Sequence, residues 1–148
     1  MRMRGISVAL AAVAAALAVP ATATPSQAAA PVSKVYLTTP YAKIVAYWTW
    51  KADRLDPVGM SVQDTASDGY AVSIRLVTES NAQGRRYWPI HTVTTGAGTG
   101  LNRTTYAITG HSPQRAWVET CKWKGGNRYD CRISEITHNP IDDSSVSG

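Results

Sequence analysis

The chain has 148 residues and a formal net charge of +5. Arg2 and Arg4 lie in an N-terminal leader, and without them 13 basic residues remain against 10 acidic ones, a net charge of about +3. A charge this small argues against a nucleic-acid-binding protein, which concentrates many more cations on one surface.

The N-terminal segment has the layout of a secretory signal peptide. Arg2 and Arg4 precede the apolar run Gly5–Val19, and the small residues of PATATPSQAAAP follow it. The run is shorter than the roughly 20 apolar residues needed to cross a bilayer. We therefore expect residues 1–28 to be removed after Ala28, with Ala23 as the alternative position, and the mature protein to be secreted and not attached to a membrane.

Beyond residues 29–33, which we expect to form a flexible approach, the chain indicates short strands separated by turns. The candidate strands are residues 34–39, 43–51, 58–63, 70–77, 86–93, 104–109, 116–124 and 128–136. The segment DTASDG, residues 64–69, indicates a hairpin turn because Asp-Gly suits the backbone angles of tight turns. TTGAGTGLNR, residues 94–103, indicates a flexible glycine-rich loop.

This pattern predicts an all-β fold. Val, Ile, Thr, Tyr and Trp dominate the strands, and turn signals recur about every ten residues, which favours an antiparallel β-sandwich of seven or eight strands, with an open barrel as the alternative. The domain is expected over residues 34–137. The polar tail, residues 138–148, is expected to be disordered.

Alternation within the strands predicts which side chains are buried. Ile44, Ala46, Trp48 and Trp50 share one face of their strand and are expected in the core, whereas Tyr47 points outward. The core face also includes Val58, Met60 and Val62 of the next strand and Val72, Ile74 and Leu76 of the strand after it.

The strand 116–124 leaves two alternatives. Trp117, Glu119, Cys121 and Trp123 share one of its faces, and Ala116, Val118 and Thr120 share the other. Burial of the tryptophan face would leave Glu119 without an evident partner, which is costly. We therefore favour the Ala116 face as core, with Trp117 and Trp123 exposed.

Both cysteines lie in CKWKGGNRYDC, and in an exported chain they indicate a Cys121–Cys131 disulfide. A three-residue loop of Gly125, Gly126 and Asn127 would place Lys124 opposite Arg128, Trp123 opposite Tyr129 and Lys122 opposite Asp130. Trp123 and Tyr129 would then stack beside the disulfide. The candidate contact residues of this hairpin region are Trp117, Lys122, Trp123, Lys124, Arg128 and Tyr129.

No motif indicates a catalytic centre, a metal site or a cofactor. The three histidines, His91, His111 and His138, lack the spacing of zinc ligands. Gly96, Gly98 and Gly100 do not match a dinucleotide or phosphate loop. Asp64 and Asp68 cover only part of a calcium loop, because Ala66 and Arg75 stand where ligands are needed. These features favour a non-catalytic protein.

The run VQDTASDGYAVSIRL, a glycine-rich loop and a late cysteine pair resemble a group of small secreted actinobacterial proteins of unknown function. The group carries an Ala-rich signal peptide, a D-T-x-x-D-G turn and a C-terminal disulfide hairpin. The resemblance covers about residues 53–131 and implies export and a β-sandwich. It implies no activity.

The resulting hypothesis is an extracellular binding module for a polysaccharide or an anionic cell-wall polymer, because tryptophan and tyrosine stack on sugars and cations meet acidic groups. The alternatives are a secreted protein-interaction factor, either an inhibitor or a structural surface protein, and a small secreted hydrolase that uses His91 or His111.

Overall fold

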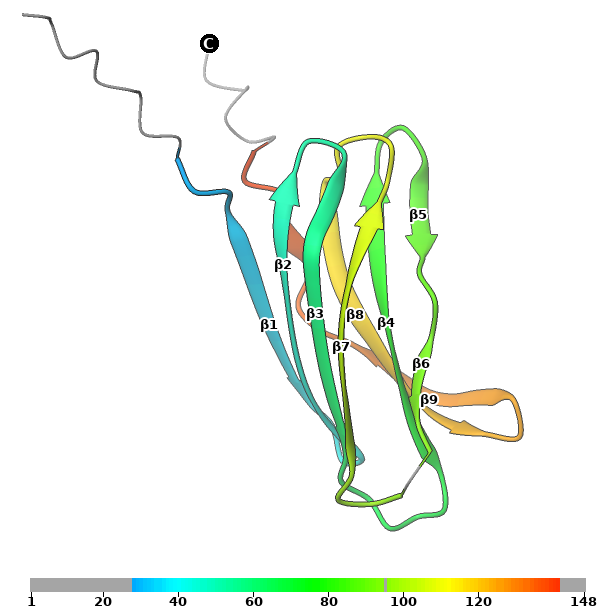
Figure 1. Cartoon of the computed structure of the whole chain (residues 1–148). Coiled ribbons are helices and arrows are strands. Elements are labelled where there is room, and N and C mark those ends of the chain that lie inside the picture. The colour runs from blue at the N-terminus through cyan, green and yellow to red at the C-terminus, as the bar shows by residue number, and fades with distance from the viewer. Residues whose placement is uncertain (1–27, 95, 142–148) are drawn as a thin grey trace, which may run out of the picture.

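The computed structural model describes residues 28–94 and 96–141, and all of their regular secondary structure is β-strand. The strands are β1 (Val32–Thr38), β2 (Ala42–Lys51), β3 (Arg54–Asp64), β4 (Ala71–Ser80), β5 (Gly84–Tyr87), β6 (His91–Val93), β7 (Gly100–Ile108), β8 (Arg115–Lys124), β9 (Asn127–Ile133) and β10 (Thr137–His138). They form two antiparallel sheets that face each other (Figure 1), so the predicted β-sandwich is confirmed.

The described part of the chain has no helix that could span a membrane. The expected signal peptide, apart from Ala28, lies outside the described residues.

Sheet A has the strand order β1-β2-β3-β7. Its inner face carries the predicted alternation, because Ile44, Ala46, Trp48 and Trp50 of β2 are all at most 2% exposed. Val58, Met60 and Val62 of β3 continue the same buried surface, as expected. Trp48 and Trp50 meet edge to face at 6.4 Å between ring centroids, a favourable geometry for aromatic pairs.

Sheet B is built around β4 and β8, which pair along nearly their full lengths. The far side of β4 pairs with β5 and β6, and the far side of β8 pairs with β9 and β10. Val72, Ile74 and Leu76 of β4 are buried against sheet A, as the alternation predicts. Ala116, Val118 and Thr120 of β8 are fully buried, so the favoured core face of this strand is confirmed. The β8–β9 hairpin extends beyond the sandwich as a finger (Figure 1).

Several local expectations are wrong. The segment DTASDG, residues 64–69, is not a hairpin turn, because β3 lies in sheet A and β4 in sheet B. It is the connection that carries the chain from one sheet to the other. The single strand expected at residues 86–93 is two strands, β5 and β6, separated by residues 88–90. The expected glycine-rich loop ends early, since β7 begins at Gly100.

The first residues of the C-terminal tail belong to the domain. Thr137 and His138 form β10 and pair with Ala116 and Arg115. Asn139 is 2% exposed, and its side-chain amide donates to the carbonyl oxygen of Pro113 at 2.8 Å. The sandwich therefore extends past the boundary expected at residue 137, while residues 142–148 lie outside the described residues.

Candidate functional site

The tip of the finger is a two-residue turn. Gly125 and Gly126 have φ values of 57° and 83°, and Lys124 pairs with Asn127. Two consecutive positive φ angles are typical of a type I′ turn, whose twist matches that of the flanking strands. The predicted three-residue loop is therefore wrong. In the observed register Trp123 lies opposite Arg128 and Lys122 lies opposite Tyr129.

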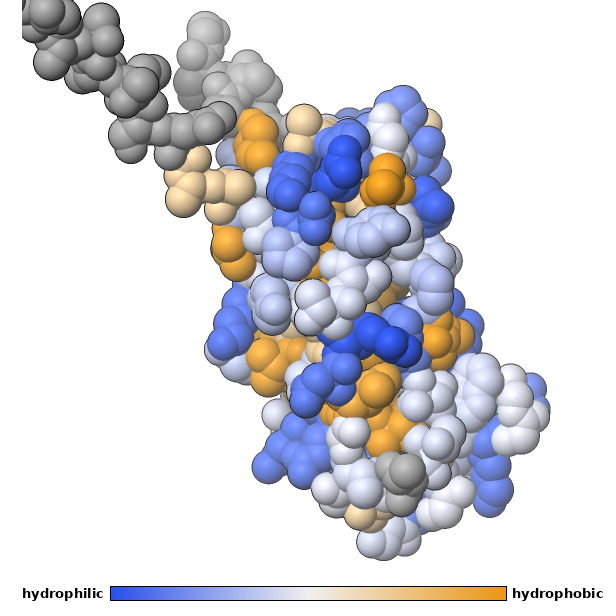
Figure 2. Space-filling view, viewed as in Figure 1, coloured by the Kyte–Doolittle hydropathy of each residue, from blue (hydrophilic) through white to orange (hydrophobic). Residues whose placement is uncertain are grey.

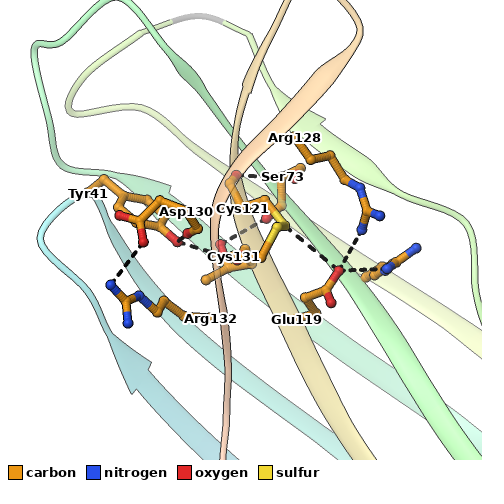
Figure 3. The surroundings of a disulfide bond; sticks show 10 residues. Tyr41, Ser73, Glu119, Cys121, Arg128, Asp130, Cys131 and Arg132 are labelled. Carbon is orange, nitrogen blue, oxygen red and sulfur yellow. Dashed lines mark hydrogen bonds and ion pairs between the residues drawn. A yellow bond between two sulfur atoms is a disulfide. The ribbon is translucent and has the colours of Figure 1, made fainter.

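A β-bulge brings the cysteines together despite this change of register. The pairing of β8 with β9 shifts by one residue between Thr120 and Lys122, and Asp130 adopts a positive φ of 45°. An extra residue on one strand is the defining feature of a bulge. Cys121 and Cys131 form the disulfide with 4.1 Å between their Cα atoms, which confirms the predicted pairing (Figure 3).

Tyr41, in the turn between β1 and β2, links sheet A to the bulge. Its hydroxyl donates to the carbonyl oxygen of Asp130, and the carbonyl oxygen of Thr120 is 3.4 Å away (Figure 3). Tyr41 is 1% exposed, and burial together with the nearby Asp130 carboxylate raises the pKa of its hydroxyl to about 12. The hydroxyl is thus held in its neutral form, which can donate the hydrogen bond.

The structure neutralises most of the charge predicted for the finger. Lys122 pairs with Asp68 at 2.8 Å, and Arg128 pairs with Glu119 at 2.7 Å. The hydrogen bond from Lys122 lowers the pKa of the Asp68 carboxyl below its usual value, which keeps this pair ionised at neutral pH. Lys124 is the one predicted cation of the finger that has no carboxylate partner among the described ion pairs.

The aromatic side chains predicted as contact residues of the finger also pack against other parts of the protein. Tyr129 does not stack on Trp123. It meets Tyr70 edge to face at 5.6 Å, and Lys124 lies 4.9 Å from the centroid of the same Tyr70 ring. Trp123 is partly buried. The expectation that Trp117 is exposed is wrong, because this side chain, although on the outer face of sheet B, is 3% exposed.

Trp117 is buried because the outer face of sheet B is covered by arginines. Arg85 of β5 lies 5.0 Å from its ring centroid, and Arg75 lies 4.1 Å from the ring centroid of Tyr87. Glu119 accepts from Arg75 at 2.7 Å as well as from Arg128, and Glu79 pairs with Arg85 and Arg115. Carboxylates and guanidinium groups therefore satisfy one another across this face, which leaves little unpaired charge for a ligand.

The outer face of sheet A has the opposite character. Strand register aligns outward side chains in three rows that cross all four strands. At one end of the sheet a shorter outward row contains Lys51 and Arg54, which pair with Asp56 and Asp53. The three full rows are Lys34, Tyr47, Gly59, Thr104; then Tyr36, Val45, Ser61, Asn102; then Thr38, Lys43, Gln63, Gly100. These residues are called here the sheet A face. The three full rows contain two lysines and no carboxylate, and neither lysine belongs to a described ion pair. The face mixes hydrophilic and hydrophobic residues and has no continuous apolar patch (Figure 2).

A hollow in the sheet A face lies beside Gly59. A Cβ atom added at Gly59 would be 2.1 Å from the ring of Tyr47, so this ring lies directly over the glycine. The hollow has a volume of about 240 Å³, and its lining residues are Val45, Tyr47, Gly59, Met60, Ser61, Asn102, Arg103 and Thr104. It therefore combines an aromatic wall with hydroxyl and amide groups in one concave site. Arg103 borders the hollow, but it pairs with the inward-facing Met60, so its side chain leaves β7 on the opposite side of sheet A, where its charge acts on His91.

Sequence reasoning identified Tyr47 as an outward residue but did not find this site. The row that brings Tyr47, Gly59 and Thr104 together joins residues up to 57 positions apart and requires the β3–β7 register. A signal was nevertheless present: Gly59 stands at an outward position inside the strand, between the inward residues Val58 and Met60. A glycine inside a strand often marks close approach by another group.

A larger groove of about 520 Å³ lies between the edge of sheet A and the disulfide. Leu37, Thr38, Thr39 and Pro40 form one side, and Cys131, Arg132 and Ile133 form the other. Arg132, the one cation of the lining, pairs with Asp130 at 2.9 Å. The groove offers an apolar surface without unpaired charge.

Neither histidine of the alternative hydrolase hypothesis, His91 or His111, takes part in a described ion pair with a carboxylate. Burial and the positive charge of Arg103 lower the pKa of His91, and no carboxylate contributes to that shift. Among the described residues, the one group with metal-ligand spacing is Glu119, Cys121 and Cys131. Its two sulfur atoms are bonded to each other, so they offer no thiolate to a metal.

Comparison of the sequence with protein-family models and with curated proteins gives no match.

Proposed function

We propose that this chain is an exported, non-catalytic protein that binds an extracellular polysaccharide or an anionic cell-wall polymer through the sheet A face. The observation that carries the proposal is the contrast between the two outer faces. On sheet B the charged side chains are paired with one another, whereas the sheet A face presents lysines without carboxylates, beside two exposed tyrosines.

The side chains of this face match the chemistry of a glycopolymer. Tyr36 is 62% exposed and Tyr47 is 39% exposed, so both offer ring surface to a sugar. Ser61, Asn102 and Thr104 add donors and acceptors at the same level of the sheet. The lysines attract anionic groups, an interaction that salt screens. An open, four-stranded surface of this kind also accommodates an extended polymer better than a deep cleft would.

Export is supported by the disulfide, because disulfides persist in oxidising compartments outside the cytosol. The measurement is the intact mass and N-terminal sequence of the protein secreted by a host that expresses the whole chain. We expect an N-terminus at Ala29, or at Thr24 if cleavage follows Ala23. Retention of the complete chain inside the cell would contradict export.

Binding is tested by retention of the purified, disulfide-bonded protein on insoluble bacterial cell wall, chitin and cellulose, and in native gels that contain soluble polysaccharides. We expect retention on at least one glycan, and we expect Tyr47→Ala to weaken it about tenfold, as replacement of a central aromatic contact commonly does. Tyr129→Ala is the matched control, since Tyr129 is 44% exposed but lies on the finger.

Two results would contradict the proposal. The first is the absence of retention on every glycan, which, together with a stable complex with an extracellular protein, would favour the protein-interaction alternative. The second is equal binding by the wild type and Tyr47→Ala with loss in Tyr129→Ala, which would place the binding surface on the finger.

A further inference from the structure

We propose that the hollow beside Gly59 is a subsite for one sugar residue of an acidic polysaccharide, with the ring stacked on Tyr47 and the flanking acidic groups held by Lys34 and Lys43. This inference rests on the proposed function and names the class of polymer and the position at which it is recognised.

The stacking surface depends on Gly59. The Tyr47 ring occupies the space above this glycine, with its Cε1, Cζ and hydroxyl oxygen between 2.1 and 2.7 Å from where a Cβ would lie. Any other residue at position 59 would displace the ring. Because no side chain rises from β3 at this point, the ring lies low over the sheet and can present a face to a ligand, as sugar stacking requires.

Polar groups line the hollow beside the ring. Thr104 lies in the same row as Tyr47 and Gly59, and Ser61 and Asn102 lie together in the next row. A hydroxyl, an amide and a second hydroxyl provide both donors and acceptors. Sugar hydroxyls need both, so this wall is suited to fixing the orientation of a stacked ring.

Two lysines lie beside this stacking surface. Lys34 is the register partner of Tyr47 on β1, and Lys43 precedes Tyr47 by four residues on β2 with its side chain on the same face. A strand rises about 3.3 Å per residue, so Lys43 lies roughly 13 Å from Tyr47 along the strand. Neither lysine belongs to a described ion pair. A polymer that lies along the sheet A face would place a sugar ring over Tyr47 and acidic groups near both lysines.

The test compares polymers that differ in one property. Affinity is measured for polygalacturonate, alginate and hyaluronate, for the methyl-esterified form of each, and for inorganic polyphosphate. We expect at least one acidic polysaccharide to bind, with at least tenfold weaker binding after esterification and with polyphosphate at least tenfold weaker than that polysaccharide. Raising the salt concentration should weaken binding further, because the cations are exposed.

Matched variants locate the subsite. Lys34→Gln should weaken binding of the acidic polymer about two- to fivefold, the range of an exposed charge pair, with no effect on any residual binding of the esterified form. Lys124→Gln on the finger is the control and should have no effect. Gly59→Ala should reduce binding of both forms about tenfold by moving the Tyr47 ring, and thermal unfolding verifies that the variant is folded. If it is not, Tyr47→Ala tests the same surface.

The outcomes separate this inference from the proposed function. Equal affinity for an acidic polymer and its ester, or binding of neutral glycans alone, would overturn the acidic subsite and leave the glycan-binding proposal standing. Polyphosphate binding as tight as that of the best polysaccharide would overturn the stacked sugar ring. No binding to any of these polymers or to neutral glycans would overturn both proposals.

Discussion

Removal of the disulfide is expected to destabilise the domain by an amount that follows from the length of the closed loop. Cys121 and Cys131 are 10 residues apart in sequence. A cross-link of this span lowers the entropy of the unfolded chain enough to contribute about 2.7 kcal/mol at 25 °C. The double substitution Cys121→Ala/Cys131→Ala should therefore lower the free energy of unfolding by that amount, and the midpoint of thermal unfolding by about 10–20 °C.

The assay is urea unfolding followed by tryptophan fluorescence, with oxidised and reduced wild-type protein as reference states. Two features should preserve the hairpin in the variant, the Gly125-Gly126 turn and the hydrogen bond from Tyr41 to the carbonyl oxygen of Asp130. The variant should thus unfold in a single transition at lower urea concentration. A loss below about 1 kcal/mol would refute the entropic reasoning, and so would a separate early transition of the finger.

Three further predictions concern stability. Tyr41→Phe should lower the free energy of unfolding by about 1–2 kcal/mol at pH 7, because Asp130 loses its donor. The raised Tyr41 pKa of about 12 means that above pH 10 the folded state binds more protons than the unfolded state, so the stabilisation by the Tyr41 hydroxyl is complete below pH 10 and declines toward pH 12. The difference in melting temperature between the wild type and Tyr41→Phe, measured from pH 8 to 11.5, should therefore become smaller as the pH rises. A difference that stays constant over this range would contradict the argument. Gly59→Ala should lower the free energy of unfolding of the wild type by about 1–3 kcal/mol, because the added methyl group would overlap the Tyr47 ring. In a Tyr47→Ala background the same substitution should be neutral or stabilising. A double-mutant cycle that shows no coupling between the two positions would contradict the close contact between them. Glu119→Gln should cost about 1–3 kcal/mol in urea unfolding because Arg75, whose side chain is 14% exposed, loses its charged partner, and an unchanged midpoint would argue against the network on sheet B.

The core of the sandwich was predictable because strand alternation is a local property. The buried residues of β2 follow the period of two that its sequence shows, and the inward residues of β4, Val72, Ile74 and Leu76, follow it as well. Ser73 and Val77 on the outer face of β4 are also buried, which alternation does not predict. The disulfide was predictable for a similar reason, since only two cysteines are present and a Gly-Gly turn lies between them. These features depend on short segments and on the chemistry of single residues.

The finger register was not predictable from the cysteine spacing. A three-residue loop without a bulge and a two-residue turn followed by a bulge both place Cys121 opposite Cys131. The two arrangements of the hairpin differ only between the disulfide and the tip, where they place a different residue opposite Trp123. The positive φ of Asp130 and its contact with Tyr41, 89 residues away, accompany the bulge, and neither is visible in the local sequence.

The burial of Trp117 and the composition of the sheet A face also depend on distant segments. Arg85 covers Trp117 from another strand, and β7 contributes Asn102 and Thr104 to a face that begins at β1. A single strand reveals which side chains point outward but not which others stand beside them. For this reason the sequence directed attention to the cations of the finger, whereas the structure shows two of these, Lys122 and Arg128, to be paired with carboxylates.

The most direct test of the proposed binding surface is a backbone amide NMR titration of the protein with the polysaccharide fragment that it retains best. The account predicts that chemical-shift changes gather on the sheet A face, around Tyr47, Gly59 and Asn102, while the finger residues Lys124 and Tyr129 are unaffected. Changes confined to the finger, or spread without preference over both sheets, would contradict it.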